Sequence, residues 1–97
     1  MEANTQEKKI QYSKLSFEEL KDLAKKGDAK AQNSLGVCYA KGDGVRKNLV
    51  KAMEWYTKAA EKGSTIAQFN LAAHYYNGDG VKQDYVKALL NLFAKRS

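Results

Sequence analysis

"GDGV" stands at Gly42–Val45 and again at Gly78–Val81, 36 positions later. When the chain is shifted by 36 residues, twelve of 35 aligned positions are identical and no gap is needed. The identities outside the loops are Gly, Ala-Gln, Leu, Tyr and Val-Lys-Ala, in the same order in both copies. A period in the mid-thirties is typical of a helix–turn–helix repeat. The sequence therefore predicts an all-α fold with two copies of one helical hairpin.

Each copy has the pattern of two helices joined by the GDGV loop. Asp28 and Ser64 are suitable N-cap residues before the first helix of each copy, and Asn48 and Asp84 stand before the second. In the first helices the shared apolar residues recur at i, i+4 and i+8, which places them on one helical face. These residues are Ala31, Leu35 and Tyr39 in the first copy, and Ala67, Leu71 and Tyr75 in the second.

A Gly-rich loop of this kind can bind a phosphate, bind a metal or turn the chain. A phosphate loop requires G-x-x-x-x-G-K-[ST] after a strand, and neither that spacing nor a strand is present. A calcium loop requires several acidic ligands at alternate positions, whereas Asp43 and Asp79 are each alone in their loops. We therefore expect a turn in which Gly42 and Gly78 end the first helices and each loop valine points inward.

One more helix is expected before the first copy, in the stretch SFEELKDLAKKG. Ser16 and Glu19 have the spacing of an S-x-x-E capping box, and Gly27 ends the pattern. The expected organisation is a polar, disorder-prone segment at 1–14 and a single domain at 15–97, with a lone helix at 16–26, repeat one at 27–62 and repeat two at 63–97.

Composition excludes several classes of protein. Hydrophobic residues make up 43% of the chain and charged residues 29%, which is typical of a folded globular domain. No apolar run approaches the roughly 18–20 residues of a membrane span, and the polar start lacks the apolar core of a signal peptide. Cys38 is the sole cysteine, so an intramolecular disulfide and a cysteine zinc site are excluded. We expect a cytoplasmic protein with no cofactor and no membrane partner.

The first copy also carries a pattern longer than its loop. It contains Ala-Gln, Leu-Gly, Tyr39, GDGV, Lys-Ala and then WYTKAAEKG. This pattern resembles the Sel-one-like repeat, a 36-residue relative of the tetratricopeptide repeat. The resemblance covers Gly27–Gly63 fully and Gly63–Ala88 well. It implies a right-handed α-solenoid whose first helices line a concave surface, a role in protein–protein interaction as an adaptor or scaffold, and no common catalytic activity.

The second copy departs from this pattern near its end. Asn91 stands where Trp55 stood, and Lys95-Arg96 stand where Ala59-Ala60 stood. Small alanines let neighbouring helices approach closely, and Lys and Arg do not. The last helix is therefore expected to be a terminal cap, as solenoids require. The alternative is that the chain is a fragment of a longer repeat array.

The last helix is strongly apolar. Leu89, Leu92 and Phe93 have the spacing i, i+3, i+4 and are expected to pack inward. Leu90 falls off that face, which makes this end of the chain a candidate contact surface. Self-association through Leu90 and Phe93 is one hypothesis for its role.

His74 and Cys38 are the candidates for chemistry. A hydrolase would use His74 as a base or Cys38 as a nucleophile. However, these residues occupy matching positions one repeat apart, and packed helices separate such positions by about 10 Å. We therefore interpret Cys38 as a small, partly buried thiol and His74 as a surface or groove residue. Trp55 could form a binding platform, but its place in the repeat favours the core.

The remaining positions on the first helices should face the concave side. Unit two carries Ile66, Phe69 and Tyr76 where unit one carries Lys30, Asn33 and Ala40. Apolar groups outside the core indicate a contact surface, so Phe69 and Tyr76 are expected to anchor a protein or peptide partner. The predicted partner-binding residues are Lys30, Asn33, Ser34, Val37, Lys41, Ile66, Phe69, Asn70, Ala73, Tyr76 and Asn77.

The net charge of +6 raises the question of a nucleic-acid partner. Nucleic-acid binding favours a basic stripe with interleaved aromatic residues. Here the lysines alternate with acids, as in KLSFEELKDLAKKGDAK, and the basic clusters are only two residues long. We therefore expect no nucleic-acid partner. An inhibitor or immunity protein that blocks an enzyme is an alternative role with the same fold.

Overall fold

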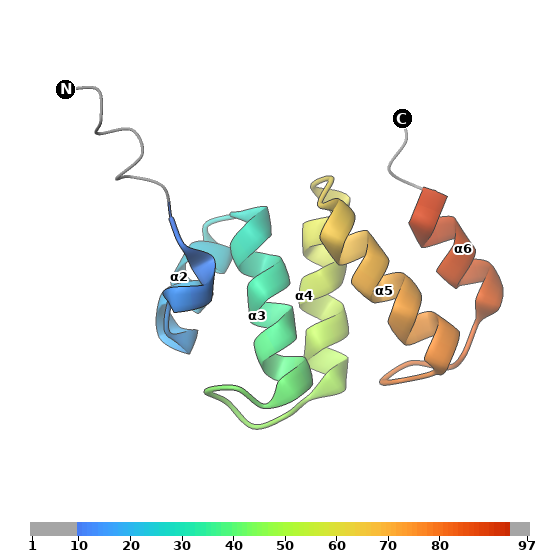
Figure 1. The fold of residues 1–97 in the computed structure, drawn as a ribbon, viewed down its shortest axis with the longest axis horizontal. Coiled ribbons are helices and arrows are strands. Elements are labelled where there is room, and N and C mark those ends of the chain that lie inside the picture. Colours follow the sequence, from blue (N-terminus) through green and yellow to red (C-terminus); the bar gives the residue numbers. More distant parts are fainter. Residues whose placement is uncertain (1–9, 94–97) are drawn as a thin grey trace.

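Five α-helices and one short 3-10 helix make up the part of the chain that this computed structural model describes, residues 10–93 (Figure 1). They are η1 (Tyr12–Lys14), α2 (Phe17–Lys25), α3 (Ala29–Lys41), α4 (Leu49–Glu61), α5 (Thr65–Asn77) and α6 (Tyr85–Phe93). No strand occurs within residues 10–93, which confirms the all-helical prediction. None of the helices described there is long and apolar enough to span a bilayer.

Side-chain caps define the helix starts that the sequence predicted. The Ser16 hydroxyl accepts a hydrogen bond from the Glu19 amide at 3.1 Å, and the Glu19 carboxylate accepts one from the Ser16 amide at 2.9 Å. This is the expected capping box before α2. The other four caps each accept a hydrogen bond from the amide three residues later, at 3.0–3.1 Å. They are Asp28, Asn48, Ser64 and Asp84.

The first glycine of each GDGV loop ends a helix, as expected. Gly42 and Gly78 are left-handed C-caps with φ of 75° and 74°. Their amides donate to the carbonyl oxygens of Cys38 and His74 at 2.8 Å. Glycine is favoured here because other L-residues adopt this backbone region at a steric cost. The loop valines are partly buried against the core, so their inward orientation is also confirmed.

The second glycine of each loop packs against the preceding unit. A Cβ atom on Gly80 would lie 2.6 Å from the Leu49 Cβ, at the start of α4. A Cβ atom on Gly44 would lie 3.1 Å from the Phe17 Cβ, at the start of α2. Both loops lie along the same edge of the molecule (Figure 1). The repeated tetrapeptide therefore turns the chain and also brings each loop against the helix before it.

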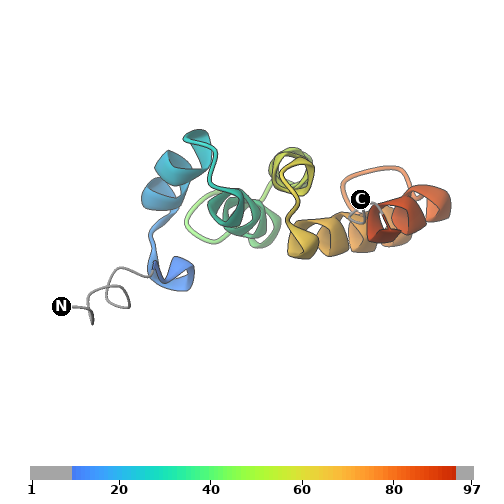
Figure 2. The ribbon, with the colours of Figure 1, turned by 90° about the horizontal axis from the view of Figure 1, so that it is seen from above.

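The helices follow one another along the long axis of the molecule (Figures 1 and 2). One buried cluster runs through them: Leu20 from α2, Leu35 from α3, Tyr56 from α4 and Leu71 from α5 are 0–3% exposed. Trp55 is partly buried and packs against this cluster, in keeping with its expected core role. The core is thus elongated along the row of helices, and each helix is buried mainly by its neighbours in sequence.

The expected burial of Leu89, Leu92 and Phe93 on α6 is wrong. Leu89, Leu92 and Phe93 are 50%, 45% and 66% exposed, and Ala88 is the buried residue of α6 within Tyr85–Phe93. The physical reason is that α6 packs on α5, and no described helix covers its other side. Lys95 and Arg96, the expected departures from the repeat, lie outside the described residues.

The segment before α2 also contributes to the packed domain. Tyr12, in η1, is partly buried against the core, and its hydroxyl donates to the Asp28 carboxylate at 2.7 Å. Asp28 is the N-cap of α3, so this bond ties η1 to the start of repeat one. The packed part of the chain therefore begins before residue 15, where the sequence placed the domain boundary.

The role of the loop glycines gives a stability prediction. Gly63 and Gly80 both have positive φ, but a Cβ atom on Gly63 would meet nothing within 4 Å. Gly63→Ala is expected to cost about 1 kcal/mol from backbone strain alone. Gly80→Ala is expected to cost about 2–4 kcal/mol, because overpacking against Leu49 adds to the same strain. Urea unfolding followed by circular dichroism measures both, and equal losses would contradict the packing role of the loop.

Candidate functional site

The predicted partner-binding residues all lie on α3 and α5, and none of them is fully buried. Those in the middle of α3 are partly buried, whereas those on α5 are exposed apart from Asn70. The exposed members are Lys30, Lys41, Ile66, Phe69, Ala73, Tyr76 and Asn77, and the partly buried members are Asn33, Ser34, Val37 and Asn70.

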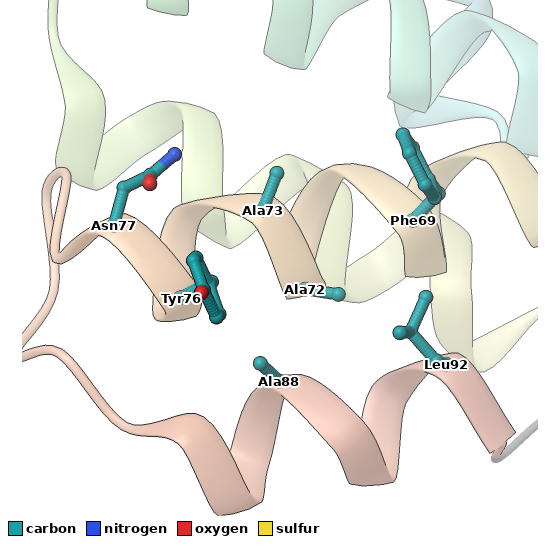
Figure 3. Close-up of a pocket in the computed structure, with 7 residues that line it drawn as sticks. All are labelled: Phe69, Ala72, Ala73, Tyr76, Asn77, Ala88 and Leu92. Atoms are coloured by element: carbon teal, nitrogen blue, oxygen red, sulfur yellow. The ribbon is translucent and has the colours of Figure 1, made fainter.

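A pocket of about 270 Å³ lies between α5 and α6 (Figure 3). The side chains of Ala72, Ala88 and Leu92 lie between the two helices, with Phe69 and Tyr76 toward opposite ends. Its seven lining residues include four that the sequence predicted. These four are Phe69, Ala73, Tyr76 and Asn77. Sequence reasoning missed the other three, Ala72, Ala88 and Leu92.

Comparison of the two units shows why unit two carries this pocket. In unit one, a Cβ atom on Gly36 would lie 2.6 Å from the Tyr56 ring, so the ring packs directly against the glycine backbone. In unit two, Ala72 stands in register with Gly36 and Leu92 with Tyr56. Leucine is shorter than tyrosine and leaves space that the Tyr56 ring fills in unit one. The replacement of tyrosine by leucine was the sequence signal for the missed pocket residues.

Two further hollows border the predicted residues of α3. One, of about 270 Å³, lies beside η1 and the start of α5 and is lined by Tyr12, Lys30, Asn33, Ser34, Ser64 and Ile66. The other, of about 290 Å³, is lined by Tyr12, Ser13, Leu15, Leu20, Ser34, Val37, Cys38 and Asp43. Lys41 and Asn70 line none of the three. Asn70 instead donates a hydrogen bond to the Asn33 side chain at 2.9 Å and links α5 to α3.

The charges are unevenly divided between the helices. Lys30 and Lys41 are the charged residues of α3, and α5 contains no acidic or basic residue other than His74. The acidic residues of the remaining helices lie on α2 and α4. They are Glu18, Glu19, Asp22, Glu54 and Glu61. The predicted contact residues therefore include no acid, and a positive charge lies at each end of α3.

His74 contacts its own GDGV loop and the preceding unit. Its Nδ1 lies 3.0 Å from the Asp79 carbonyl oxygen, so a protonated Nδ1 donates to the loop. Its ring lies 5.5 Å from the Tyr56 ring of the preceding unit. Within residues 10–93, no group of three His, Cys, Asp or Glu side chains could hold a metal ion. His74 thus supports the loop and the contact between the two units.

Cys38 is partly buried, as expected. Burial and, to a lesser extent, the Asp43 charge raise the pKa of the Cys38 thiol. A raised pKa lowers the thiolate fraction at neutral pH, and the thiolate is the nucleophilic form. The structure therefore gives no support to Cys38 as an activated nucleophile.

These repeats match a known family. The Sel1 repeat family matches residues 29–64, which contain α3 and α4. It also matches residues 65–91, which contain α5 and most of α6. The chain belongs to the Sel1 repeat family. Repeats of this family generally mediate protein–protein interactions. The resemblance expected from WYTKAAEKG and the two GDGV loops is confirmed.

Several larger proteins contain similar repeats. The secretory immunoglobulin A-binding protein EsiB of Escherichia coli O6:H1 is 45% identical over 45 residues, which are 46% of this chain and 9% of EsiB. The putative sel1-like repeat-containing protein L18 of Acanthamoeba polyphaga mimivirus is 46% identical over 43 residues, 44% of this chain and 7% of L18. This Sel1 repeat chain thus spans less than a tenth of these relatives' lengths.

Two crystal structures share the fold. The structure of c5321, a protective antigen of uropathogenic Escherichia coli with an SLR fold, gives a TM-score of 0.78 at 43% identity. It matches 84% of this chain and 17% of the other. A Sel1 repeat protein from Oxalobacter formigenes gives a TM-score of 0.67 at 43% identity, over 72% of this chain and 28% of the other. The α-solenoid expected from the sequence is therefore confirmed.

The Cys38 environment gives a reactivity prediction. Iodoacetamide at pH 7.5 is expected to alkylate Cys38 at least about tenfold more slowly in the folded chain than in the chain unfolded by urea, because burial both raises the pKa and limits access. Mass spectrometry at timed intervals measures the two rates. Equal rates, or faster reaction in the folded chain, would indicate an activated thiol and revive the hydrolase hypothesis.

Proposed function

We propose that this chain is a non-catalytic interaction module that binds a partner protein on the face formed by α3 and α5. The observation that carries the proposal is the exposure of Ile66, Phe69 and Tyr76, which are 64%, 63% and 59% exposed. They stand at repeat positions where unit one carries shorter or polar side chains. The general role of Sel1 repeats in protein–protein interaction supports the same reading.

The energetics of the exposed side chains favour a protein partner. An aromatic side chain buries a large area on binding, and aromatic residues are enriched among the residues that dominate interface energies. Phe69 and Tyr76 both line the pocket between α5 and α6, so a partner side chain that enters it would contact both. Removing apolar surface from water contributes roughly 25 cal/mol for each Å² buried.

Charge restricts the kind of partner. The chain has a net charge of +6. Lys30 and Lys41 lie on α3, and neither α3 nor α5 contains an acidic residue. We therefore propose that the partner surface combines apolar side chains with acidic ones, which would also speed association at low salt. The partner of EsiB, named as secretory immunoglobulin A, shows that a protein with such repeats can bind another protein.

We also propose a cytoplasmic location, in which the Cys38 thiol stays reduced.

Self-association is a second candidate, because Leu90 and Phe93 are 60% and 66% exposed on α6. Light scattering behind a sizing column tests it with the Leu90→Asp, Phe93→Asp variant. A dimeric wild type and a monomeric variant would support this role, and a monomeric wild type at high concentration would exclude it.

The main proposal is tested by capture from native lysate with immobilised wild-type chain and the Phe69→Ala, Tyr76→Ala variant. The variant is expected to bind the captured partner at least about tenfold more weakly, because two aromatic contacts are lost. Both side chains are more than half exposed, so the helical circular dichroism signal should not change.

The matched control is Val50→Ala, Val86→Ala, which removes two exposed apolar side chains outside the proposed face. This control should bind the partner as the wild type does. Equal binding by the wild type and the Phe69→Ala, Tyr76→Ala variant would place the contact elsewhere and contradict the proposal.

A further inference from the structure

We propose that the pocket between α5 and α6 receives an amphipathic α-helix of the partner protein, packed there as α5 packs on unit one. The inference rests on the proposed function, because it specifies the partner segment that a binding module of this kind would hold. It adds a geometry and a residue pattern that the exposure of Phe69 and Tyr76 alone does not give.

The structure contains an internal example of the proposed contact, namely α5 on unit one. Ala67, Asn70, Leu71 and His74 of α5 have the spacing i, i+3, i+4, i+7 and so lie on one face of the helix. Ala67 and Leu71 are 0% and 3% exposed. Asn70 and His74 make the two contacts that identify where α5 sits on the preceding hairpin.

The two residues that α5 contacts on unit one correspond to two residues of the pocket on unit two. Asn70 donates to the Asn33 side chain on α3, and the His74 ring lies 5.5 Å from the Tyr56 ring on α4. In the 36-residue register, Asn33 corresponds to Phe69 and Tyr56 to Leu92. Phe69 and Leu92 both line the pocket (Figure 3). The pocket therefore borders the surface of unit two that corresponds to the α5-binding surface of unit one.

The side chains that differ between the units define the occupant. In a helix bound there, the residues equivalent to Asn70 and His74 would face Phe69 and Leu92. Phe69 offers no hydrogen bond where Asn33 does, so an asparagine opposite it would be desolvated without a partner. Ala72, Ala73 and Ala88 line the same pocket and let a helix approach closely. The expected pattern is small-x-x-apolar-Leu-x-x-apolar, which matches helix-in-groove recognition.

The first helices of this chain's own two units do not fit the pattern expected of the bound helix. At the two positions that would face Phe69 and Leu92, α5 carries Asn70 and His74. The first helix of unit one carries Ser34 and Cys38 there. Neither supplies the two apolar side chains that the pocket favours, and both helices are already packed in the domain.

A synthetic helix derived from α5 is the direct probe. A fluorescein-labelled peptide with the sequence of residues 64–77, carrying Asn70→Leu and His74→Leu, is titrated with the full chain and followed by anisotropy. We expect saturable binding in the micromolar range. The unmodified 64–77 peptide is expected to bind at least about tenfold more weakly, since its Asn and His would face apolar walls.

Two aspartate variants on α6 locate the binding. Leu92→Asp places a charge in the pocket wall and should weaken binding of the modified peptide at least about tenfold. Val86→Asp is the matched control, because Val86 is 67% exposed on the same helix and does not line the pocket. It should bind as the wild type does. Phe69→Asp repeats the Leu92→Asp test from the α5 side, and circular dichroism checks that each variant is folded.

Three outcomes of the peptide titration would overturn the inference. They are the absence of saturable binding up to about 1 mM peptide, the same affinity for both peptides, and unchanged binding by Leu92→Asp and Phe69→Asp. A wild-type dimer that Leu92→Asp dissociates would make the occupant a second copy and also contradict it. Loss of lysate capture by Phe69→Ala, Tyr76→Ala, together with failure of the peptide, would leave the proposed function intact and reject only the helix.

Discussion

The contact of α5 with the α3–α4 hairpin joins the two units into one structure. Leu71 is buried in the same cluster as Tyr56, while Asn70 bonds to Asn33 and His74 packs on the Tyr56 ring. A single hairpin of this length cannot bury its apolar face, and stacking on a neighbour provides the missing cover. The second GDGV loop reinforces the contact, because Gly80 packs against the start of α4.

The same stacking rule accounts for the surface proposed to bind a partner. Residues identical between the units, such as Leu35 with Leu71, maintain the fold, and residues that differ determine what each unit contacts. Unit one presents Asn33 and Tyr56, and α5 covers them. Unit two presents Phe69 and Leu92 in the same places, and both stay about half or more exposed. Unit two thus presents two apolar side chains where unit one presents an asparagine and a tyrosine.

The sequence predicted the local structure well because each signal was local. The capping box at Ser16, the cap at Asn48 and the C-cap at Gly42 each depend on atoms within a few residues. The packing role of Gly80 was not predictable, because it depends on Leu49, 31 residues earlier. Likewise, spacing placed Leu92 on the inner face of α6, but periodicity cannot reveal that Leu92 stays 45% exposed there, with no further helix over it among residues 10–93. Ala72 was missed because the pocket arises from a pair of substitutions on two helices.

Hydrogen–deuterium exchange of the chain, with and without the purified protein that it captures, tests the central claim most directly. We expect slower amide exchange on binding in α3 and in residues 66–77 and 88–92, since a partner on the face of α3 and α5 that also enters the pocket would cover α3, α5 and the inner side of α6. Exchange in α2 and at the exposed face of α4 should change little. Protection confined to α2 and α4, with residues 66–77 unaffected, would contradict the account and place the partner on the opposite side of the solenoid.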